Sequence, residues 1–171
     1  ALVVGVQAQT PEMDALRARA EQGDAVAQVN LGNMFADGRG VPEDDAEAVR
    51  LYRLAAEQGD AEAQYNLGFV YANGEGVAQD DAEAVRLYRL AAEQGDASAM
   101  TNLGAMYSQG RGVVQDYVQS HMWRNLAASR QTGEDRELSV KARDAVASFM
   151  TADDLSEAQR LAREWDEAHP R

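Results

Sequence analysis

Apolar residues recur every three or four positions in two neighbouring stretches near the start of the chain. The first stretch runs over about 24–36, and the second begins near Asp44 or Asp45. This spacing places the apolar residues on one side of a helix, so each stretch predicts an amphipathic helix. The glycines of Gly38-Arg39-Gly40 favour the left-handed conformation that ends a helix. The predicted buried positions are Ala27, Leu31, Met34 and Phe35, and then Ala48, Leu51, Tyr52 and Ala55.

This pair of predicted helices returns with a fixed period. The sequence Ala-Glu-Gln-Gly-Asp-Ala begins at Ala20, Ala56 and Ala92, and the steps 56 − 20 and 92 − 56 are both 36 residues. The run over 44–61 is repeated without change over 80–97. One short helix pair cannot bury its own apolar face, so neighbouring pairs must stack. The sequence therefore predicts an all-α fold, an αα-superhelical repeat solenoid of three 36-residue units.

Helical segments without the repeat motif flank the three units. Thr10-Pro11 has the residues of a helix N-cap and first turn, and the helix that follows aligns with the second helix of the later units. Two further amphipathic helices have predicted buried positions at Leu138, Ala142, Val146 and Phe149, and at Leu155, Ala158, Ala162 and Trp165. We therefore expect a single repeat domain over 9–171, with an N-terminal helix over 9–23, three repeats over 24–131 and capping helices over 132–171.

Glycine occupies the middle of the first predicted helix in every unit, at Gly32, Gly68 and Gly104. A glycine inside a helix costs roughly 1 kcal/mol relative to alanine. Its return at one repeat position predicts that the paired helix approaches too closely there for a Cβ atom.

Residues 1–8 form a short apolar run that ends in Val-Gln-Ala. The run resembles the end of a signal peptide with its cleavage site, and the alternative is a disordered tail. We expect export, to the periplasm, with a cytoplasmic location as the alternative. No other stretch approaches about 18 consecutive apolar residues, so no transmembrane helix is expected.

The pattern Ala-Gln-Tyr-Asn-Leu-Gly…Tyr…Gly-x-Gly-Val…Asp…Ala over 63–82 resembles the bacterial Sel-one-like repeat (SLR), which is related to the tetratricopeptide repeat. The resemblance covers three units over about 20–128, and 116–128 and 158–165 resemble the last unit and cap of such proteins. It implies an αα superhelix that acts as an adaptor in protein assemblies.

In tetratricopeptide repeats the first helices line a concave groove, and the resemblance implies the same arrangement here. The face of each first helix away from its predicted buried side then supplies the binding residues. These candidate binding residues are Val29, Asn30, Asn33 and Asp37; Glu62, Tyr65, Asn66, Phe69 and Asn73; and Thr101, Asn102 and Gln109.

Most of the candidate groove positions differ between units, whereas the predicted buried positions are nearly identical. The differing sets are Val29, Tyr65 and Thr101 at one position, and Asn33, Phe69 and Ala105 at another. A groove that faces a non-repeating ligand needs no repetition. The alternative is that these positions only face solvent.

Asn30, Asn66 and Asn102 are the same in every unit. An amide both donates and accepts, so these side chains either hold the backbone of an extended peptide or bond a neighbouring helix. Tyr65 and Phe69 lie one turn apart and either form an apolar platform for a ligand or pack against the next unit.

Charge and composition argue against several classes of function. The formal net charge is −13, and Lys141 is the one lysine, which disfavours binding to nucleic acids or anionic membranes. The absence of cysteine excludes disulfides and thiolate chemistry. His121 and His169 have no metal or catalytic motif around them, and the Gly-Arg-Gly loops lack the residues of a phosphate-binding loop. We therefore expect no enzyme activity, cofactor, metal or small-molecule substrate.

The sequence thus predicts a protein–protein interaction adaptor that binds a peptide or protein segment in the groove. The alternatives are a cell-envelope hydrolase and a structural spacer that self-associates through its ends.

Overall fold

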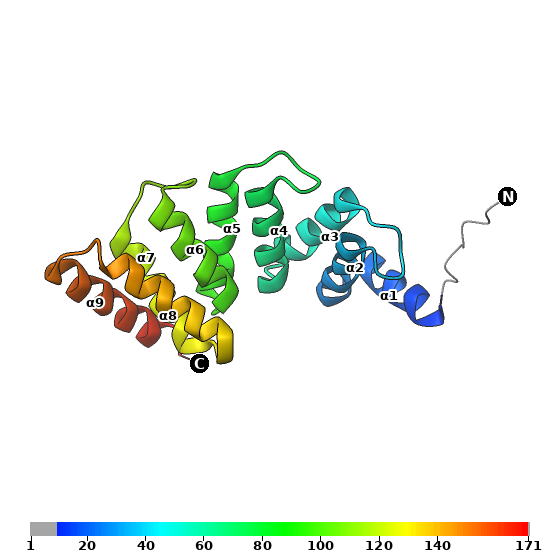
Figure 1. Ribbon diagram of the computed structural model, residues 1–171. Coiled ribbons are helices and arrows are strands. Elements are labelled where there is room, and N and C mark those ends of the chain that lie inside the picture. Colours follow the sequence, from blue (N-terminus) through cyan, green and yellow to red (C-terminus); the bar gives the residue numbers. More distant parts are fainter. Residues whose placement is uncertain (1–9, 171) are drawn as a thin grey trace. The chain divides into compact units, whose positions relative to one another are not determined.

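The computed structural model describes residues 10–170, which form nine α-helices and no β-strand (Figure 1). Residues 1–8, predicted to be the end of a signal peptide or a disordered tail, lie outside the described residues. The helices are α1 (Pro11–Glu21), α2 (Ala25–Asp37), α3 (Asp45–Glu57), α4 (Ala61–Asn73), α5 (Asp81–Glu93), α6 (Ala97–Gln109), α7 (Tyr117–Arg130), α8 (Gly133–Ala147) and α9 (Ala152–Ala168). The predicted all-α fold of repeated helix pairs is confirmed.

The chain folds as two compact units that divide between Gln79 and Asp80. Unit 1 contains α1 to α4, and unit 2 contains α5 to α9. The division falls between the two helices of the second repeat.

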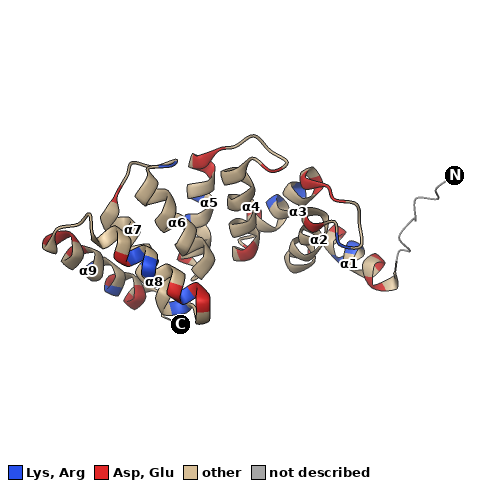
Figure 2. Ribbon diagram, viewed as in Figure 1, with Lys and Arg blue, Asp and Glu red and all other residues tan. Residues whose placement is uncertain are grey.

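Aspartate begins each helix of the three repeats. Asp24, Asp60 and Asp96 accept hydrogen bonds from the backbone N–H groups of Ala27, Ala63 and Ala99 at 3.1, 2.8 and 2.6 Å. Asp44, Asp80 and Asp116 cap the second helices in the same way. Acidic residues consequently gather where helices start, where they also favour the helix dipole (Figure 2). The first helices end at Gly38, Gly74 and Gly110, each in the left-handed conformation.

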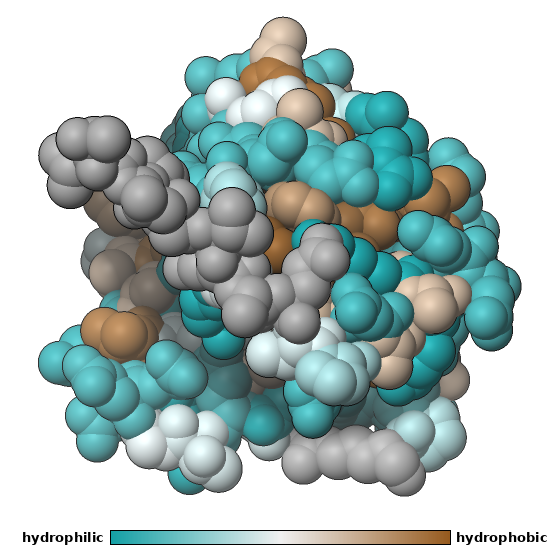
Figure 3. All heavy atoms as spheres, turned by 90° about the vertical axis from the view of Figure 1, so that its right-hand side faces the viewer, coloured by the Kyte–Doolittle hydropathy of each residue, from teal (hydrophilic) through white to brown (hydrophobic). Residues whose placement is uncertain are grey.

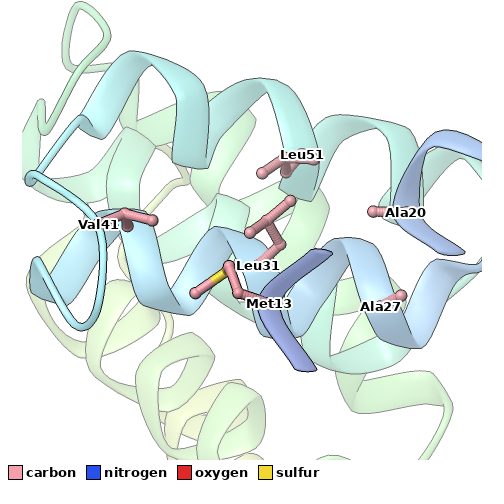
Figure 4. Close-up of a cluster of buried hydrophobic side chains, with 6 residues drawn as sticks. All are labelled: Met13, Ala20, Ala27, Leu31, Val41 and Leu51. Atoms are coloured by element: carbon pink, nitrogen blue, oxygen red, sulfur yellow. The ribbon is translucent and has the colours of Figure 1, made fainter. Parts of the chain in front are cut away.

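The core of unit 1 joins the N-terminal helix to the first repeat. One cluster contains buried residues of α1, α2, α3 and the intervening loop: Met13, Ala20, Ala27, Leu31, Val41 and Leu51 (Figure 4). Helix α1 therefore covers the apolar side of α2 that a preceding repeat would otherwise cover. The face at this end of the molecule is mostly hydrophilic, with hydrophobic residues exposed in small separate areas (Figure 3).

The mid-helix glycines lie where the paired helices touch. A Cβ atom on Gly32 would lie 2.7 Å from a ring carbon of Tyr52, which is buried in α3. A Cβ atom on Gly104 would lie 2.8 Å from Cγ of Arg124 and 3.2 Å from the carbonyl oxygen of Ser120 in α7. The close approach of the paired helix, which was predicted as the reason for these glycines, is confirmed at both positions.

Unit 2 ends in two capping helices that pack on α7. The buried Trp123 makes an edge-on contact with Trp165 of α9, with ring centroids 6.0 Å apart. The guanidinium of Arg130 lies 4.7 Å from the Trp165 ring and pairs with Asp166 at 2.6 Å. Trp123 stands where the first two repeats have Leu51 and Leu87, and its larger ring packs against α9. No helix in residues 10–170 is both long enough and apolar enough to cross a membrane.

The predicted buried face of α8 was wrong at its two ends. Leu138 and Phe149 are 55% and 68% exposed, whereas Ser139 is buried beside the expected Val146. Ser139 turns inward because its hydroxyl donates to Gln131 at 2.6 Å and contacts the Thr101 hydroxyl at 3.3 Å. Phe149 lies beyond the end of α8 and stacks on Tyr117 at 5.3 Å.

His121 occupies the position of Val49 and Val85, since 49 + 36 = 85 and 85 + 36 = 121. It is as buried as they are, and its Nδ1 has no hydrogen-bond partner within residues 10–170. Burial lowers the pKa of His121, and the charge of Arg143 lowers it further, against a smaller opposite effect of Asp144.

We expect Gly32→Ala to destabilise the protein by about 1–3 kcal/mol, because the new methyl group overpacks against Tyr52. The same change in a Tyr52→Ala background should be neutral or stabilising, because the ring is gone and alanine favours the helix. Urea unfolding of the four proteins of this cycle measures the coupling, and an equal effect in both backgrounds would contradict the contact.

The buried His121 should make the protein less stable in acid. Because the pKa of His121 is lower in the folded than in the unfolded protein, the unfolded state binds more protons as the pH falls. The protein should therefore lose stability relative to His121→Val, which carries the residue of the other units, as the pH falls below the ordinary histidine pKa of about 6.5. Thermal unfolding at several pH values tests this, and parallel pH profiles would show that His121 contributes nothing.

Candidate functional site

A hollow of about 250 Å³ lies in unit 1 between α2, α3 and α4. Four of the predicted binding residues line it: Asn33, Asp37, Asn66 and Phe69. The remaining lining residues are Ala36, Asp45, Ala48, Tyr52, Val70 and Glu75. We call this site the acidic hollow, because three of its ten lining residues are carboxylates.

Asn33 connects the three helices around the acidic hollow. Its side-chain oxygen accepts hydrogen bonds from the Tyr52 hydroxyl at 2.8 Å and from the Asn66 amide at 3.1 Å. Its own amide donates to the Glu62 carboxylate at 3.3 Å. The Asn66 amide therefore donates a hydrogen bond to a neighbouring helix, which is the second of the two roles predicted for this residue. Asn66 also lines the hollow.

Tyr52 forms part of the lining, although the sequence indicated only a buried position for it. The residue is 5% exposed, and burial together with the charges of Asp37 and Glu62 raises the pKa of its hydroxyl to about 12. The sequence contained a signal for this role of Tyr52. A buried tyrosine hydroxyl needs a polar partner, and Gly32 leaves room for the ring.

The carboxylates of the acidic hollow differ from their equivalents in unit 2. There Asp81, the equivalent of Asp45, pairs with Arg111 at 2.6 Å. Position 75 is the equivalent of Arg111, since 75 + 36 = 111, but it holds Glu75. The described part of the chain offers no ion-pair partner to Asp45 or Glu75. The acidic hollow thus lacks the internal cation that its equivalent has at this position.

Phe69 supplies the apolar side of the acidic hollow and is 43% exposed. Tyr65, one turn earlier on α4, is partly buried and does not line the hollow. The structure therefore places one of the two predicted platform residues at this site.

The other candidates of the first helices lie elsewhere. Val29 was wrongly predicted to face a ligand: it is 2% exposed and packs with Ala55 and Ala63, because α2 contacts helices on two sides. Thr101 has its hydroxyl engaged by the Ala97 carbonyl, Ser139 and Gln131. The remaining candidates, none of which lines the acidic hollow, are the exposed Asn30, Glu62, Asn73 and Gln109 and the partly buried Asn102.

A larger hollow of about 670 Å³ lies against the other side of α3, among α1, α2 and α3. Its apolar lining includes Phe35 and Leu54, and its charged pair Glu47–Arg50 is already joined at 2.6 Å. The equivalents of Phe35 are Tyr71 and Tyr107, whose hydroxyls bond Arg53 and Arg89. This hollow was not among the sites predicted from the sequence. Residues 10–170 contain no cluster of carboxylates and histidines placed to hold a metal ion.

Asn33→Ala should lower the free energy of unfolding by about 1–3 kcal/mol, because the Tyr52 hydroxyl and the Asn66 amide lose their acceptor. Asn30→Ala is the matched control, since Asn30 is exposed and makes no hydrogen bond through its side chain within the described residues. Its effect should stay within about 0.5 kcal/mol. Equal losses for the two variants in urea unfolding would show that the Asn33 contacts are not formed.

Comparison with known proteins agrees with the repeat geometry. The Sel1 repeat model matches residues 25–60, 61–96 and 97–131. A protective antigen present in uropathogenic Escherichia coli strains, which displays an SLR fold, is 35% identical with a TM-score of 0.83 over 95% of this chain. The present chain spans 34% of the length of that protein.

A Sel1 repeat protein from Oxalobacter formigenes is 33% identical with a TM-score of 0.68, over 77% of this chain and 99% of its own length. The comparison with curated proteins found no match. The matched repeats cover more than half of the residues and coincide with the helix pairs of the structure. The chain therefore belongs to the Sel1 repeat family, an all-α solenoid family whose members generally mediate protein–protein interactions.

Proposed function

We propose that this protein is an interaction scaffold that binds a segment of another protein at the acidic hollow of unit 1. The observation that carries the proposal is the pair Asp45 and Glu75, which line the hollow without a cation. In unit 2 the same position of the loop supplies Arg111 from within the molecule. A lysine or arginine of the bound segment would take the place of that internal arginine.

The surrounding residues support a partner with one basic and one apolar side chain. Asp37 adds a third carboxylate to the hollow. This carboxylate also forms an ion pair with the exposed Arg39, at an N–O distance of 2.9 Å. Phe69 offers an exposed ring to the same hollow. An arginine or lysine stem can cover the ring while its charged end reaches the carboxylates. The net charge of −13 also favours encounter with a basic surface.

Asn33 and Asn66 contribute positioning to this proposal. Because Asn33 is bonded to Tyr52, Asn66 and Glu62, the polar groups around the hollow are held in place before a partner arrives. Preorganisation of this kind lowers the entropic cost of binding. Sel1 repeat proteins are typically scaffolds, which favours this function over the alternative of a hydrolase.

The test uses the whole protein as bait in envelope and soluble bacterial extracts, with cross-linking and mass spectrometry. Phe69→Ala should weaken capture about 10- to 100-fold, the loss expected for one apolar anchor worth about 1.5–3 kcal/mol. Glu75→Arg should also abolish capture, because the new arginine pairs with Asp45. This variant carries the residue found at the equivalent Arg39 and Arg111, so its helicity should be unchanged in circular dichroism.

Leu54→Ala is the matched control, since Leu54 is 38% exposed in unit 1 but lines the larger hollow on the other side of α3. A partner kept by Leu54→Ala, weakened by Phe69→Ala and lost by Glu75→Arg supports the proposal. A partner lost only by Leu54→Ala would move the binding site to the larger hollow. Self-association alone, seen by sedimentation and unaffected by Glu75→Arg, would favour the structural spacer.

A further inference from the structure

Arg124 breaks the repeat at a position that carries tyrosine in the other units. Its equivalents are Tyr52 and Tyr88, since 52 + 36 = 88 and 88 + 36 = 124. The sequence has thus exchanged a neutral hydroxyl for a permanent positive charge at one position of α7.

The stem of Arg124 follows the path of the tyrosine that it replaces. Its Cγ lies across Gly104 of α6, as the ring of Tyr52 lies across Gly32 of α2. Ser120, one turn earlier on α7, is the equivalent of Ala48, since 48 + 72 = 120. Because Ala48 and Tyr52 both line the acidic hollow, Ser120 and Arg124 occupy the corresponding face of the third repeat.

Most of the Arg124 side chain is buried, and its guanidinium has no opposite charge beside it within residues 10–170. Its Nη atoms are not among the buried atoms that lack a partner, so this edge of the guanidinium reaches the surface. The residue is 9% exposed, and its one hydrogen bond within residues 10–170 runs from Nε to the Ser120 hydroxyl at 3.3 Å. Ser120 is itself fixed, because its hydroxyl donates to the Gly104 carbonyl at 2.7 Å. Burial lowers the pKa of Arg124, and no carboxylate in the described part of the chain opposes this effect.

The missing partner is unusual in a protein with 29 acidic residues. Arg130, whose side chain is also 9% exposed, pairs with Asp166 at 2.6 Å. Tyr52 has Asn33 as its acceptor, whereas the equivalent position in the third repeat is Ala105, since 33 + 72 = 105. Partial burial of an unpaired charge is unfavourable, so an anion from outside the molecule would be stabilised at this position.

We propose that Arg124 binds a carboxylate of a protein partner of this scaffold. The Nε atom is used by Ser120, which leaves the edge formed by Nη1 and Nη2 for a ligand. Two parallel N–H groups on that edge match the two oxygens of one carboxylate. The carboxylate is either the C-terminus of the bound polypeptide or the side chain of an aspartate or glutamate.

The same geometry argues against the other common anion of macromolecular partners. Phosphate groups are usually held by several cations or by a row of backbone amides. Arg124 is a single buried cation in a protein of net charge −13. Two neighbouring nitrogens, His121 Nδ1 and Trp123 Nε1, also lack partners within residues 10–170, but they are sealed from solvent and cannot meet the ligand.

This inference deepens the proposed function and rests on it for the nature of the occupant, but small carboxylates can test Arg124 without any protein partner. The probes are acetate, N-acetylglycine as the mimic of a polypeptide C-terminus, and N-acetylaspartic acid α-amide as the mimic of an acidic side chain. N-acetylglycinamide is the uncharged control. The measurements are the NMR signal of the Arg124 Nε–H group and the melting temperature, each against sodium chloride at equal ionic strength.

We expect the three carboxylates to shift the Nε–H signal to saturation, with dissociation constants on the order of millimolar for one ion pair. The melting temperature should rise with the same concentration dependence, because the ligand binds only the folded state. Arg124→Tyr, which carries the residue of the other two repeats, should fold and lose the rise in melting temperature. Arg163→Gln removes an exposed arginine and should keep it.

A stronger effect of N-acetylglycine would identify a C-terminal carboxylate, and a stronger effect of the aspartate probe would identify a side chain. No saturable shift up to about 100 mM, or an equal rise in melting temperature for Arg124→Tyr, overturns the proposal. Saturable carboxylate binding together with failure of the capture experiment would leave the Arg124 site standing and remove the scaffold function. Loss of a partner by Phe69→Ala without any carboxylate effect would support the scaffold function and overturn the Arg124 site.

Discussion

Close contact between the paired helices is the constraint on which the other features of each repeat depend. At Gly32 and Gly104 the partner side chain lies within 2.8 Å of the position that a Cβ atom would take, so no other residue type fits without displacement. This contact fixes the distance between the two helices and therefore the place where residue 52 or 124 emerges. The Tyr52 hydroxyl meets Asn33 because the ring can cross the glycine, and Arg124 takes the same path.

The chemistry of the sites comes from departures from the repeat. The helix caps, the glycines and most buried positions are shared, and they hold the backbone in an equivalent arrangement. Glu75 stands where the other units have arginine, and Arg124 stands where they have tyrosine. Each exchange leaves a charge that the described part of the chain does not neutralise. The two exchanges have opposite signs.

Repetition made much of the fold predictable, because aspartate caps and glycine stops act locally and return at fixed intervals. The assignment of faces was less reliable. Helix α2 contacts neighbours on two sides, so Val29 fits both the core and the predicted binding face by spacing alone. Helix α8 has no repeat partner in the sequence, and its orientation depends on the distant Thr101 and Gln131, which draw Ser139 inward. The acidic hollow needed the same three-dimensional information, because its residues come from three helices and a loop.

The locally capped starts of the helices and the glycine ends of the first helices have a consequence for how such a protein changes over evolutionary time. Every repeat begins with its own aspartate cap and closes its first helix with its own glycine, so these helix ends borrow no hydrogen bond from a neighbouring repeat. A duplication or deletion of 36 residues therefore preserves the satisfied backbone on both sides of the junction. The identical run over 44–61 and 80–97 is the trace that a recent event of this kind would leave. Position 75 nevertheless differs in charge from positions 39 and 111, so a copied module can take on a new recognition property by a single exchange in its loop.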